Sequence, residues 1–377
     1  MIQKTKFGNN EVLYLSKILD NIKPKNILLV IGRKSFIDSG INSIIEKILK
    51  NHTYKTFKNE MSYDNMDNII DGINFINHNN FDFIIAIGGG SVIDKAKIIN
   101  ILTPGNNNLI NAIKKKDFRK NKIPLIAIPT TSGTGSESTK FATLYNKKIK
   151  YSIEHKSLIP EYAIIDPMLT QSNSIQTIIS SGLDALSQSI ESYWSVGANK
   201  ESKEYASEAM EIAWNILPKF ANSEATNHDW EMISWAAHLS GKAINISKTT
   251  ACHAISYYLT ANYGISHGHA VALTLGPVFK YNLETTDNVL NDRRGRAYCI
   301  NCLNEICAIL NIKNLNKIKK YFDDFLIELN LKKNLTDFNV KKSDLNTIVN
   351  NINIDRMNNN PRSFTKKDIF NILESIY

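Results

Sequence analysis

The sequence predicts an α/β domain with a parallel sheet, followed by an all-α domain. The chain has 377 residues, 43% of them hydrophobic, which suits two domains of about 100–200 residues each. Short apolar runs alternate with helical patterns up to about residue 166, and helical patterns dominate beyond residue 170. We therefore expect domains at residues 1–166 and 167–377.

Four strands are expected in the first domain. Uninterrupted isoleucine, leucine and valine runs are typical of parallel strands buried on both faces. Helix-spaced apolar residues lie between two of the runs, at residues 40–50 and 63–78. The apolar runs occupy residues 27–31, 83–87, 123–128 and 163–165.

The second domain begins with helical spacing at Leu183, Leu186, Ile190 and Tyr193, one face of a helix. We find no internal repeat of about 20–50 residues, so a solenoid is not indicated.

A glycine-rich loop follows the second strand. Gly-Gly-Gly-Ser at residues 88–91 opens a helix that carries Asp94 and Lys97. Glycines let the backbone approach a phosphate, and helix N-termini attract anions. A tight strand–helix turn is the alternative explanation for the glycines, and neither a Walker A loop nor the six-residue Rossmann fingerprint is present.

A second loop, Pro-Thr-Thr-Ser-Gly-Thr-Gly-Ser-Glu at residues 129–137, leaves the third strand. Its hydroxyl groups suit phosphate oxygens, although a turn that caps a helix through Ser136 is an alternative. Two such loops at the ends of parallel strands predict a shared ligand crevice.

Asp184 and Gln188 lie four residues apart, so on a helix they share a face. His253 precedes His267 by 14 residues, and the segment between them reads as a helix ending at Gly264. One carboxylate, one amide and two imidazoles can hold a divalent metal, whereas a lone histidine is more often a satisfied core or surface residue.

Net charge is +9 and the isoelectric point is about 9.1, which leaves nucleic acid, a membrane surface or an anionic ligand as partners. The basic run at residues 114–122 lacks a reading helix or stacking aromatics, so nucleic acid is not expected. The N-terminus has no signal-peptide core and no run reaches about 18 apolar residues. We expect a cytoplasmic protein without membrane contact, whose cysteines 299, 302 and 307 pack within a helix.

Five motifs in order resemble the iron-containing alcohol dehydrogenases, with matching spacing from about residue 27 to the Asn-Pro-Arg at 360–362. The motifs are Gly-Gly-Gly-Ser-x-x-Asp-x-x-Lys (88–97), Pro-Thr-Thr-x-Gly-Thr-Gly-Ser-Glu (129–137), Asp-Pro-x-Leu (166–169), Gly-x-Asp-Ala-Leu (182–186) and Tyr-Gly-Ile-x-His-Gly (263–268). The resemblance implies a dinucleotide-binding domain, a helical domain and a metal in the cleft between them, the architecture shared with dehydroquinate synthase-like proteins.

By this resemblance Asp184, His253 and His267 match three metal ligands, and Gln188 stands where the fourth is normally histidine. Four residues after His253, where the family usually has a second histidine, this chain has Tyr257. An amide oxygen is a weaker ligand than imidazole, so the identity of the metal, iron or zinc, stays open. The candidate cofactor-binding residues are Gly32, Gly89, Gly90, Ser91, Asp94, Thr130, Thr131, Thr134 and Lys150.

The departures at 188 and 257 resemble the branch of the family that reduces phosphonoacetaldehyde to 2-hydroxyethylphosphonate. The branch implies hydride transfer from a nicotinamide to an anionic aldehyde, with protonation through His267, His269, Tyr257 or water. The candidate phosphonate-binding residues are Lys150, Lys248, Thr249 and Arg362.

The cofactor is expected to be NADPH, with NADH as the alternative. NAD-preferring members of the family usually present an acidic residue where this chain has Gly32. Arg33 and Lys34 follow it, and they would attract a 2′-phosphate.

Three other functions stay open from the sequence. One is a broader aldehyde or polyol dehydrogenase of the same family, and another is a dehydroquinate synthase-like lyase or cyclase. The third is a cofactor-binding protein that has lost catalysis, which the changes at Gln188 and Tyr257 permit. The family also suggests a homodimer or a larger assembly.

Overall fold

The computed structural model describes residues 3–59, 66–102, 109–119, 122–146 and 149–377. The chain divides into two compact units, Met1–Asn173 (unit 1) and Ser174–Tyr377 (unit 2). The division lies shortly after Asp166, where the sequence pattern changes from alternating to helical.

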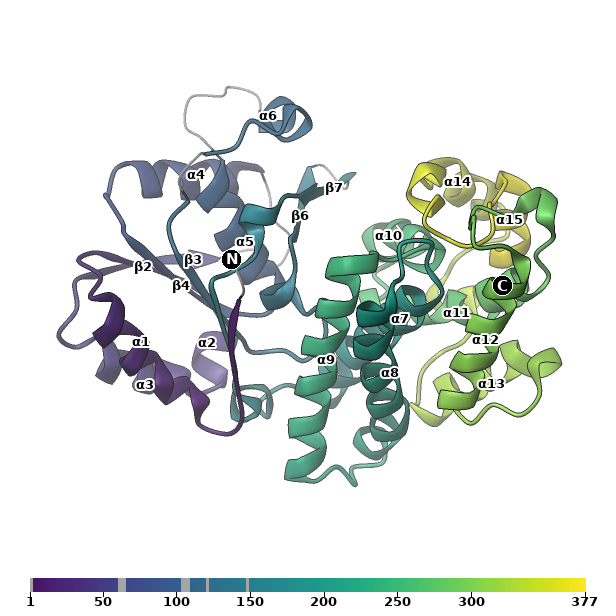
Figure 1. Cartoon of the computed structure of the whole chain (residues 1–377), viewed down its shortest axis with the longest axis horizontal. Helices are drawn as coiled ribbons and strands as arrows, with labels where there is room; N and C mark the ends of the chain where they lie inside the picture. Colours follow the sequence, from purple (N-terminus) through teal and green to yellow (C-terminus); the bar gives the residue numbers. More distant parts are fainter. Residues whose placement is uncertain (1–2, 60–65, 103–108, 120–121, 147–148) are drawn as a thin grey trace. The chain divides into compact units, whose positions relative to one another are not determined.

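Unit 1 contains a six-stranded sheet in the order β1-β8-β5-β4-β2-β3, and every neighbouring pair is parallel (Figure 1). The four predicted strands are confirmed as the central strands and their neighbour β8. The strand bounds are β1 Lys4–Phe7, β2 Ile27–Gly32, β3 Tyr54–Asn59, β4 Phe83–Gly88, β5 Leu125–Pro129 and β8 Tyr162–Ile165.

The two edge strands, β1 and β3, were not predicted. Their sequences, Lys-Thr-Lys-Phe and Tyr-Lys-Thr-Phe-Lys-Asn, contain lysines in place of an apolar run. Lysine on an edge strand discourages pairing with another chain. A run of apolar residues therefore predicts the strands that are buried on both faces, but it does not predict the edge strands β1 and β3.

Helices cover both faces of the sheet, which explains why the central strands are apolar throughout. Leu28 and Val30 pack in one cluster with α4 and α5, whereas Ile27, Leu29 and Ile31 pack in another with α1 and α3. The helices of unit 1 are α1 Leu15–Ile22, α2 Ser35–Asp38, α3 Ile41–Leu49, α4 Met66–Asn77, α5 Gly90–Ile101 and α6 Leu109–Lys115.

A separate antiparallel hairpin, β6 Phe141–Asn146 with β7 Ile149–Glu154, completes unit 1. It was not predicted either. The predicted helices at 40–50 and 63–78 correspond to α3 and α4, although residues 63–65 lie outside the described ranges.

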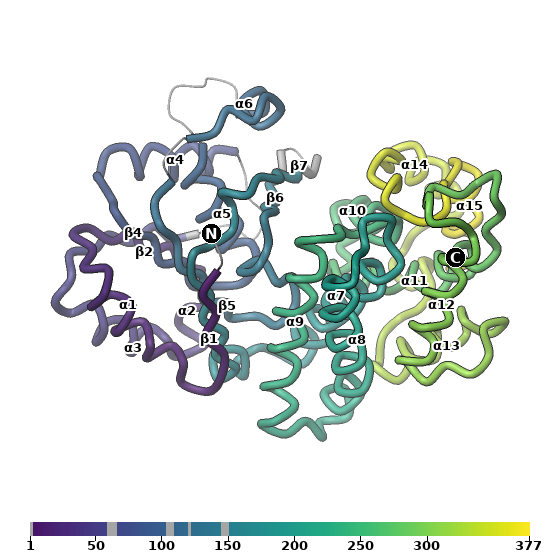
Figure 2. Tube along the Cα trace, viewed as in Figure 1, coloured from purple at the N-terminus to yellow at the C-terminus, as the bar shows by residue number. Residues whose placement is uncertain are grey.

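Unit 2, which is described throughout, is helical as predicted and contains no strand. Its helix α7 contacts α8, α9, α11 and α12 and lies next to α8 and α9 in Figure 2. The helices are α7 Ile175–Trp194, α8 Lys200–Ala221, α9 Asn227–Ser247, α10 Ala251–Tyr263, α11 His267–Leu283, α12 Arg296–Ile309, α13 Ile318–Glu328, α14 Asp344–Asn351 and α15 Lys366–Ser375.

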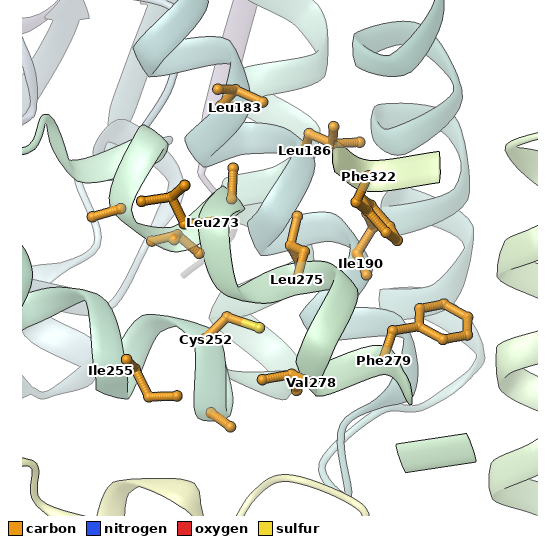
Figure 3. Packing of buried hydrophobic residues seen from close by; sticks show 14 of the residues in the cluster. Leu183, Leu186, Ile190, Cys252, Ile255, Leu273, Leu275, Val278, Phe279 and Phe322 are labelled. Atoms are coloured by element: carbon orange, nitrogen blue, oxygen red, sulfur yellow. The ribbon is translucent and has the colours of Figure 1, made fainter. Parts of the chain in front are cut away.

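The predicted apolar stripe on α7 is confirmed as core. Leu183, Leu186 and Ile190 pack in one cluster with Leu275 and Phe279 of α11 (Figure 3). The stripe accounts for only part of α7, because every residue from 182 to 194 is buried. Polar side chains on this helix are consequently buried as well.

Two smaller predictions concern cysteines and membranes. The cysteines at 299, 302 and 307 are buried free thiols on α12, as expected. Among the described residues, we find no helix with the length and hydropathy that a membrane crossing requires.

Candidate functional site

Three loops of unit 1 lie together at the carboxyl ends of the parallel strands. Gly88 ends β4 and pairs in register with Pro129 at the end of β5, and Gly32 ends the neighbouring strand β2. Because these strands are parallel, the loops that follow them lie together at their carboxyl ends. The predicted crevice-forming loops are therefore neighbours in the fold.

The glycine loop is the predicted strand–helix turn. Gly89 is the N-cap of α5, and Ser91 in its first turn is exposed. A Cβ on Gly90 would lie 2.6 Å from Thr134 Oγ1, so glycine is needed for the two loops to pack. The first amide groups of a helix lack intrahelical acceptors and suit a phosphate.

Asp94 and Lys97 of α5 hold the second loop in place. Asp94 accepts hydrogen bonds from Ser136 Oγ and from the Thr143 amide, the latter at 2.8 Å. Lys97 Nζ donates to Ser136 Oγ and to the carbonyl oxygens of Thr139 and Phe141 at 2.9–3.1 Å. The Asp94 carboxylate, a predicted cofactor contact, is thus engaged by the loop.

Burial lowers the pKa of Lys97 to about 8, against the opposing charges of Asp94 and Glu137. Ser136 is not the helix cap that one interpretation of the loop proposed. Gly135 occupies the N-cap of the short 3-10 helix Ser136–Ser138, which frees the Ser136 hydroxyl for Asp94.

The other cofactor candidates of unit 1 lie in or beside these loops. The Thr130 amide donates to the Gly88 carbonyl at 3.0 Å, Thr131 is half-buried and Thr134 is exposed. Gly32 is buried with Arg33 exposed beside it. Lys150 has its backbone in β7, and its side chain lies outside the described residues.

In unit 2, helix α7 places three polar residues on one face. Asp184, Gln188 and Glu191 stand at i, i+4 and i+7, and each is at most 4% exposed. Asp184 and Gln188 were predicted as site residues from the sequence, and Glu191 was not. The helical spacing was the available signal, but a glutamate on a helix usually lies at the surface.

His253, in the first turn of α10, lies between two of these carboxylates. Its Nε2 is 3.2 Å from Asp184 Oδ1, and its Nδ1 is hydrogen-bonded to Glu191 Oε2. Burial alone would lower the pKa of His253, but Glu191 and Asp184 raise it to about 9. Burial acts to raise the pKa of Glu191, and the interaction with His253 brings it below its usual range.

His267, the first residue of α11, joins the group beside His253, with the two ring centroids 5.5 Å apart. Its Nε2 is 3.8 Å from Asp184 Oδ1. The next residue, Gly268, explains the approach: a Cβ there would overlap the Ser180 carbonyl oxygen and lie 2.7 Å from the Asp184 amide nitrogen. Only glycine lets the backbone of α11 come this close to α7.

Asp184, His253 and His267 each offer a ligand atom, and these atoms lie within 4.8 Å of one another. We call these three residues the D-H-H cluster. One carboxylate oxygen and two imidazole nitrogens form a donor set that suits iron or zinc. The residues therefore fit the metal that the sequence resemblance implies.

Gln188, the predicted fourth ligand, is held by a neighbour on α9. Its Oε1 accepts a hydrogen bond from Ser240 Oγ at 3.0 Å. A carbonyl oxygen has two lone pairs, so this hydrogen bond uses one of them.

Tyr257 lies beside the D-H-H cluster. Its ring stacks on His267 with centroids 5.8 Å apart, and the Arg356 guanidinium lies 5.3 Å from the Tyr257 centroid. Lys248, exposed between α9 and α10, has a φ of 65°. The adjoining Thr249 is half-buried, and its carbonyl accepts a hydrogen bond from the Asn359 amide.

Two predicted site residues lie elsewhere in unit 2. His269 Nε2 is 2.6 Å from the Lys332 carbonyl oxygen, and burial lowers its pKa. It is two residues from His267, so α11 directs the two side chains differently. Arg362 donates to the Tyr281 carbonyl and lies 3.8 Å from Asp368. The structure thus does not bring His269 into the cluster, and it engages Arg362 in contacts within the fold.

Comparisons with known proteins agree with this arrangement. Residues 3–167 match the model of the iron-containing alcohol dehydrogenase family, and residues 178–377 match the model of that family's C-terminal domain. The structure superposes on an iron-containing alcohol dehydrogenase from Thermotoga maritima with a TM-score of 0.85 and 27% identity, covering 100% of this chain and 98% of the other.

Two curated relatives match over shorter stretches. A phosphonoacetaldehyde reductase from Streptomyces viridochromogenes is 32% identical over 61% of this chain and 60% of its own length. An NAD-dependent methanol dehydrogenase from Bacillus methanolicus is 30% identical over 56% of each chain. The chain thus spans less than two thirds of the length of these relatives.

We expect the substitution Gly268→Ala to separate α11 from α7 and displace His267. Overpacking at a backbone contact costs about 1–3 kcal/mol of unfolding free energy, and Zn²⁺ affinity should fall with it. Gly264→Ala is the control: its Cβ meets nothing within 4 Å, but its φ of 67° is strained for alanine. That control should lose stability alone. Unchanged Zn²⁺ affinity in Gly268→Ala would contradict the role of this contact.

We expect Gln188→His to bind Zn²⁺ more tightly than the natural chain, by about tenfold or 1.4 kcal/mol, because imidazole is a stronger ligand than an amide oxygen. Competition with a chromophoric chelator measures the affinity. Gln188→Ala should bind no more tightly than the natural chain. Equal affinity of the histidine variant and the natural chain would show that a side chain at position 188 does not reach the cation.

Proposed function

This chain belongs to the iron-containing alcohol dehydrogenase family, and we propose that it is an oxidoreductase that reduces phosphonoacetaldehyde to 2-hydroxyethylphosphonate with a nicotinamide cofactor. The observation that carries the proposal is the D-H-H cluster in unit 2, combined with the nucleotide-type loops of unit 1. Similarity to the phosphonoacetaldehyde reductase of Streptomyces viridochromogenes supports the choice of substrate.

The reduction transfers a hydride to the aldehyde carbon and a proton to its oxygen. A divalent metal bound by Asp184, His253 and His267 would supply Lewis-acid polarisation of the carbonyl group. The surrounding protein contributes preorganised polar groups, which stabilise developing negative charge without reorganising. Iron and zinc both suit the donor set.

Tyr257 and His267 are the proton-donor candidates that the geometry supports. The His267 side chain is about a third exposed, 32%, and its Nε2 lies 3.8 Å from Asp184 Oδ1. The Tyr257 ring is nearly parallel to the His267 ring, with centroids 5.8 Å apart, and the Tyr257 hydroxyl can donate a hydrogen bond to a polar substrate. We do not include His269 in this proposal, because its Nε2 contacts the Lys332 carbonyl oxygen.

Recognition of the phosphonate is assigned to the Lys248–Thr249 segment that leads into α10. A non-glycine residue with positive φ costs about 1–3 kcal/mol, and such residues cluster at functional sites. Asn359 bonds the carbonyl oxygens on both sides of Lys248, those of Ser247 and Thr249, at 2.7 and 3.1 Å. The strained backbone is thereby fixed, five residues before His253.

The cofactor is proposed to be NADPH. Gly32 sits where an acidic residue would bind a ribose hydroxyl and repel a 2′-phosphate. The exposed Arg33 and Lys34 that follow β2 offer positive charge at the same edge of the sheet as the glycine loop.

We expect Lys248→Ala to lower kcat/KM for phosphonoacetaldehyde about 10–100-fold, because a charge-assisted contact to the phosphonate is lost. Turnover of acetaldehyde, which has no anionic group, should change less than about threefold. Lys200→Ala, at an exposed position on α8, should affect neither substrate. Equal losses on both aldehydes would remove the phosphonate-binding role, and faster turnover of acetaldehyde would favour a broader aldehyde reductase.

For the cofactor, we expect a higher kcat/KM with NADPH than with NADH. The double substitution Arg33→Ala and Lys34→Ala should raise the KM for NADPH about tenfold and leave that for NADH nearly unchanged. Lys25→Ala serves as the control, since this exposed lysine precedes β2 and lies at the amino end of that strand, away from Arg33 and Lys34. A strong preference of the natural chain for NADH would overturn this choice.

A further inference from the structure

We propose that Glu191 is a positioning residue that fixes the orientation and tautomer of His253 for metal binding. The inference rests on the proposed metal-binding role of the D-H-H cluster. It adds a residue that does not itself reach the cation but determines how one of the ligands is presented.

Glu191 is fully buried on α7, two helical turns after Asp184 on the same face. The two carboxylates therefore contact opposite nitrogens of one imidazole. Asp184 faces Nε2 of His253 and Glu191 binds Nδ1. With both nitrogens committed to groups on one helix, the ring has little freedom to rotate.

The hydrogen bonds of Glu191 are complete. Its Oε1 accepts from Thr250 Oγ1 at 2.6 Å and from the Cys252 amide at 2.7 Å, and its Oε2 takes His253 Nδ1. An ionised carboxylate only accepts, so Nδ1 must carry the hydrogen. In a cation-loaded site the lone pair then belongs to Nε2, the atom that faces Asp184. Partners of this kind commonly fix the tautomer of a ligating histidine.

A second hydrogen bond braces Glu191 from behind. The Trp194 indole N–H donates a hydrogen bond to Thr250 Oγ1 at 2.9 Å, and the Thr250 hydroxyl in turn donates a hydrogen bond to Glu191 Oε1. Trp194 is on the same helix, one turn further on, and is 2% exposed. The chain Trp194–Thr250–Glu191 therefore ties the start of α10 to α7 and locates the carboxylate.

A purely structural role is the competing explanation, because Glu191 also accepts from the Cys252 amide at the start of α10. Glu191→Gln separates the two roles. The amide oxygen can keep the contacts with Thr250 and Cys252, but the amide nitrogen cannot accept a hydrogen from His253 Nδ1. Thr250→Val does the reverse, because it removes the brace and leaves the carboxylate–imidazole pair.

Binding of Co²⁺ to the full-length chain, without cofactor or aldehyde, tests the proposal. Chelator competition gives the affinity and the visible absorption bands report the ligand geometry. We expect Glu191→Gln to weaken Co²⁺ binding about 10–100-fold and to alter the bands, with partial recovery in Glu191→Asp. Thr250→Val should lower the thermal stability and keep Co²⁺ affinity within about threefold.

Unchanged Co²⁺ affinity and bands in Glu191→Gln would overturn the proposal and leave only the structural role. Should the substituted chains fail to fold, the natural chain loaded with Zn²⁺ provides the test. Nitrogen-15 NMR of its histidines should show His253 protonated at Nδ1, and ligation through Nδ1 would overturn the proposal. Neither measurement uses a substrate, so the identity of the aldehyde can be wrong while this inference stands.

Discussion

Unit 2 is organised by the need to balance the negative charge buried on α7. An ionised carboxylate taken out of water is costly unless it gains cationic or hydrogen-bonding partners. Asp184 and Glu191 are almost inaccessible to solvent, and His253 lies between them. A divalent cation beside His267 would add the positive charge that such a donor set is suited to hold. The positions of α10 and α11 follow from this requirement, because each delivers one imidazole to the same helix.

Packing and electrostatics cooperate at this point. The close approach of α11 depends on Gly268, whose missing Cβ leaves room for the Ser180 carbonyl. The approach of α10 depends on Glu191, Thr250 and Trp194, which connect its first turn to α7 by hydrogen bonds. One helix is thus positioned by steric fit and the other by a polar network.

Unit 1 uses the same principle on a smaller scale. Asp94 and the buried Lys97 have side chains suited to binding a ligand, but here they form hydrogen bonds with Ser136 and so hold the second loop in place. The glycine and hydroxyl groups of the two loops remain for a phosphate. The net charge of +9 accordingly has a specific use in the proposed anionic cofactor and substrate, while many lysines remain ordinary surface residues.

Much of this protein could be predicted from the sequence alone. The buried strands, the change to helices after residue 170, and the phosphate-type turn after β4 follow from local patterns of apolar and glycine residues. Asp184, His253 and His267 were also predicted from the sequence, because the order and spacing of the motifs match them to the metal ligands of the family they resemble. The lysine-rich edge strands were missed, since an edge needs solubility more than apolar burial.

Tertiary structure alone decided which polar residues act together. Asp94, Ser136, His269 and Arg362 have side chains suited to a site, yet the fold directs them to contacts with neighbouring loops and carbonyl groups. Glu191 differs from these residues, because it was not predicted as a site residue from the sequence. In the fold it is buried against His253, which lies 62 positions away in the chain. Sequence patterns record what a residue can do and which face of an element it occupies. Partners distant in the chain are chosen by packing, because only the folded chain determines which buried charges must be balanced by which others.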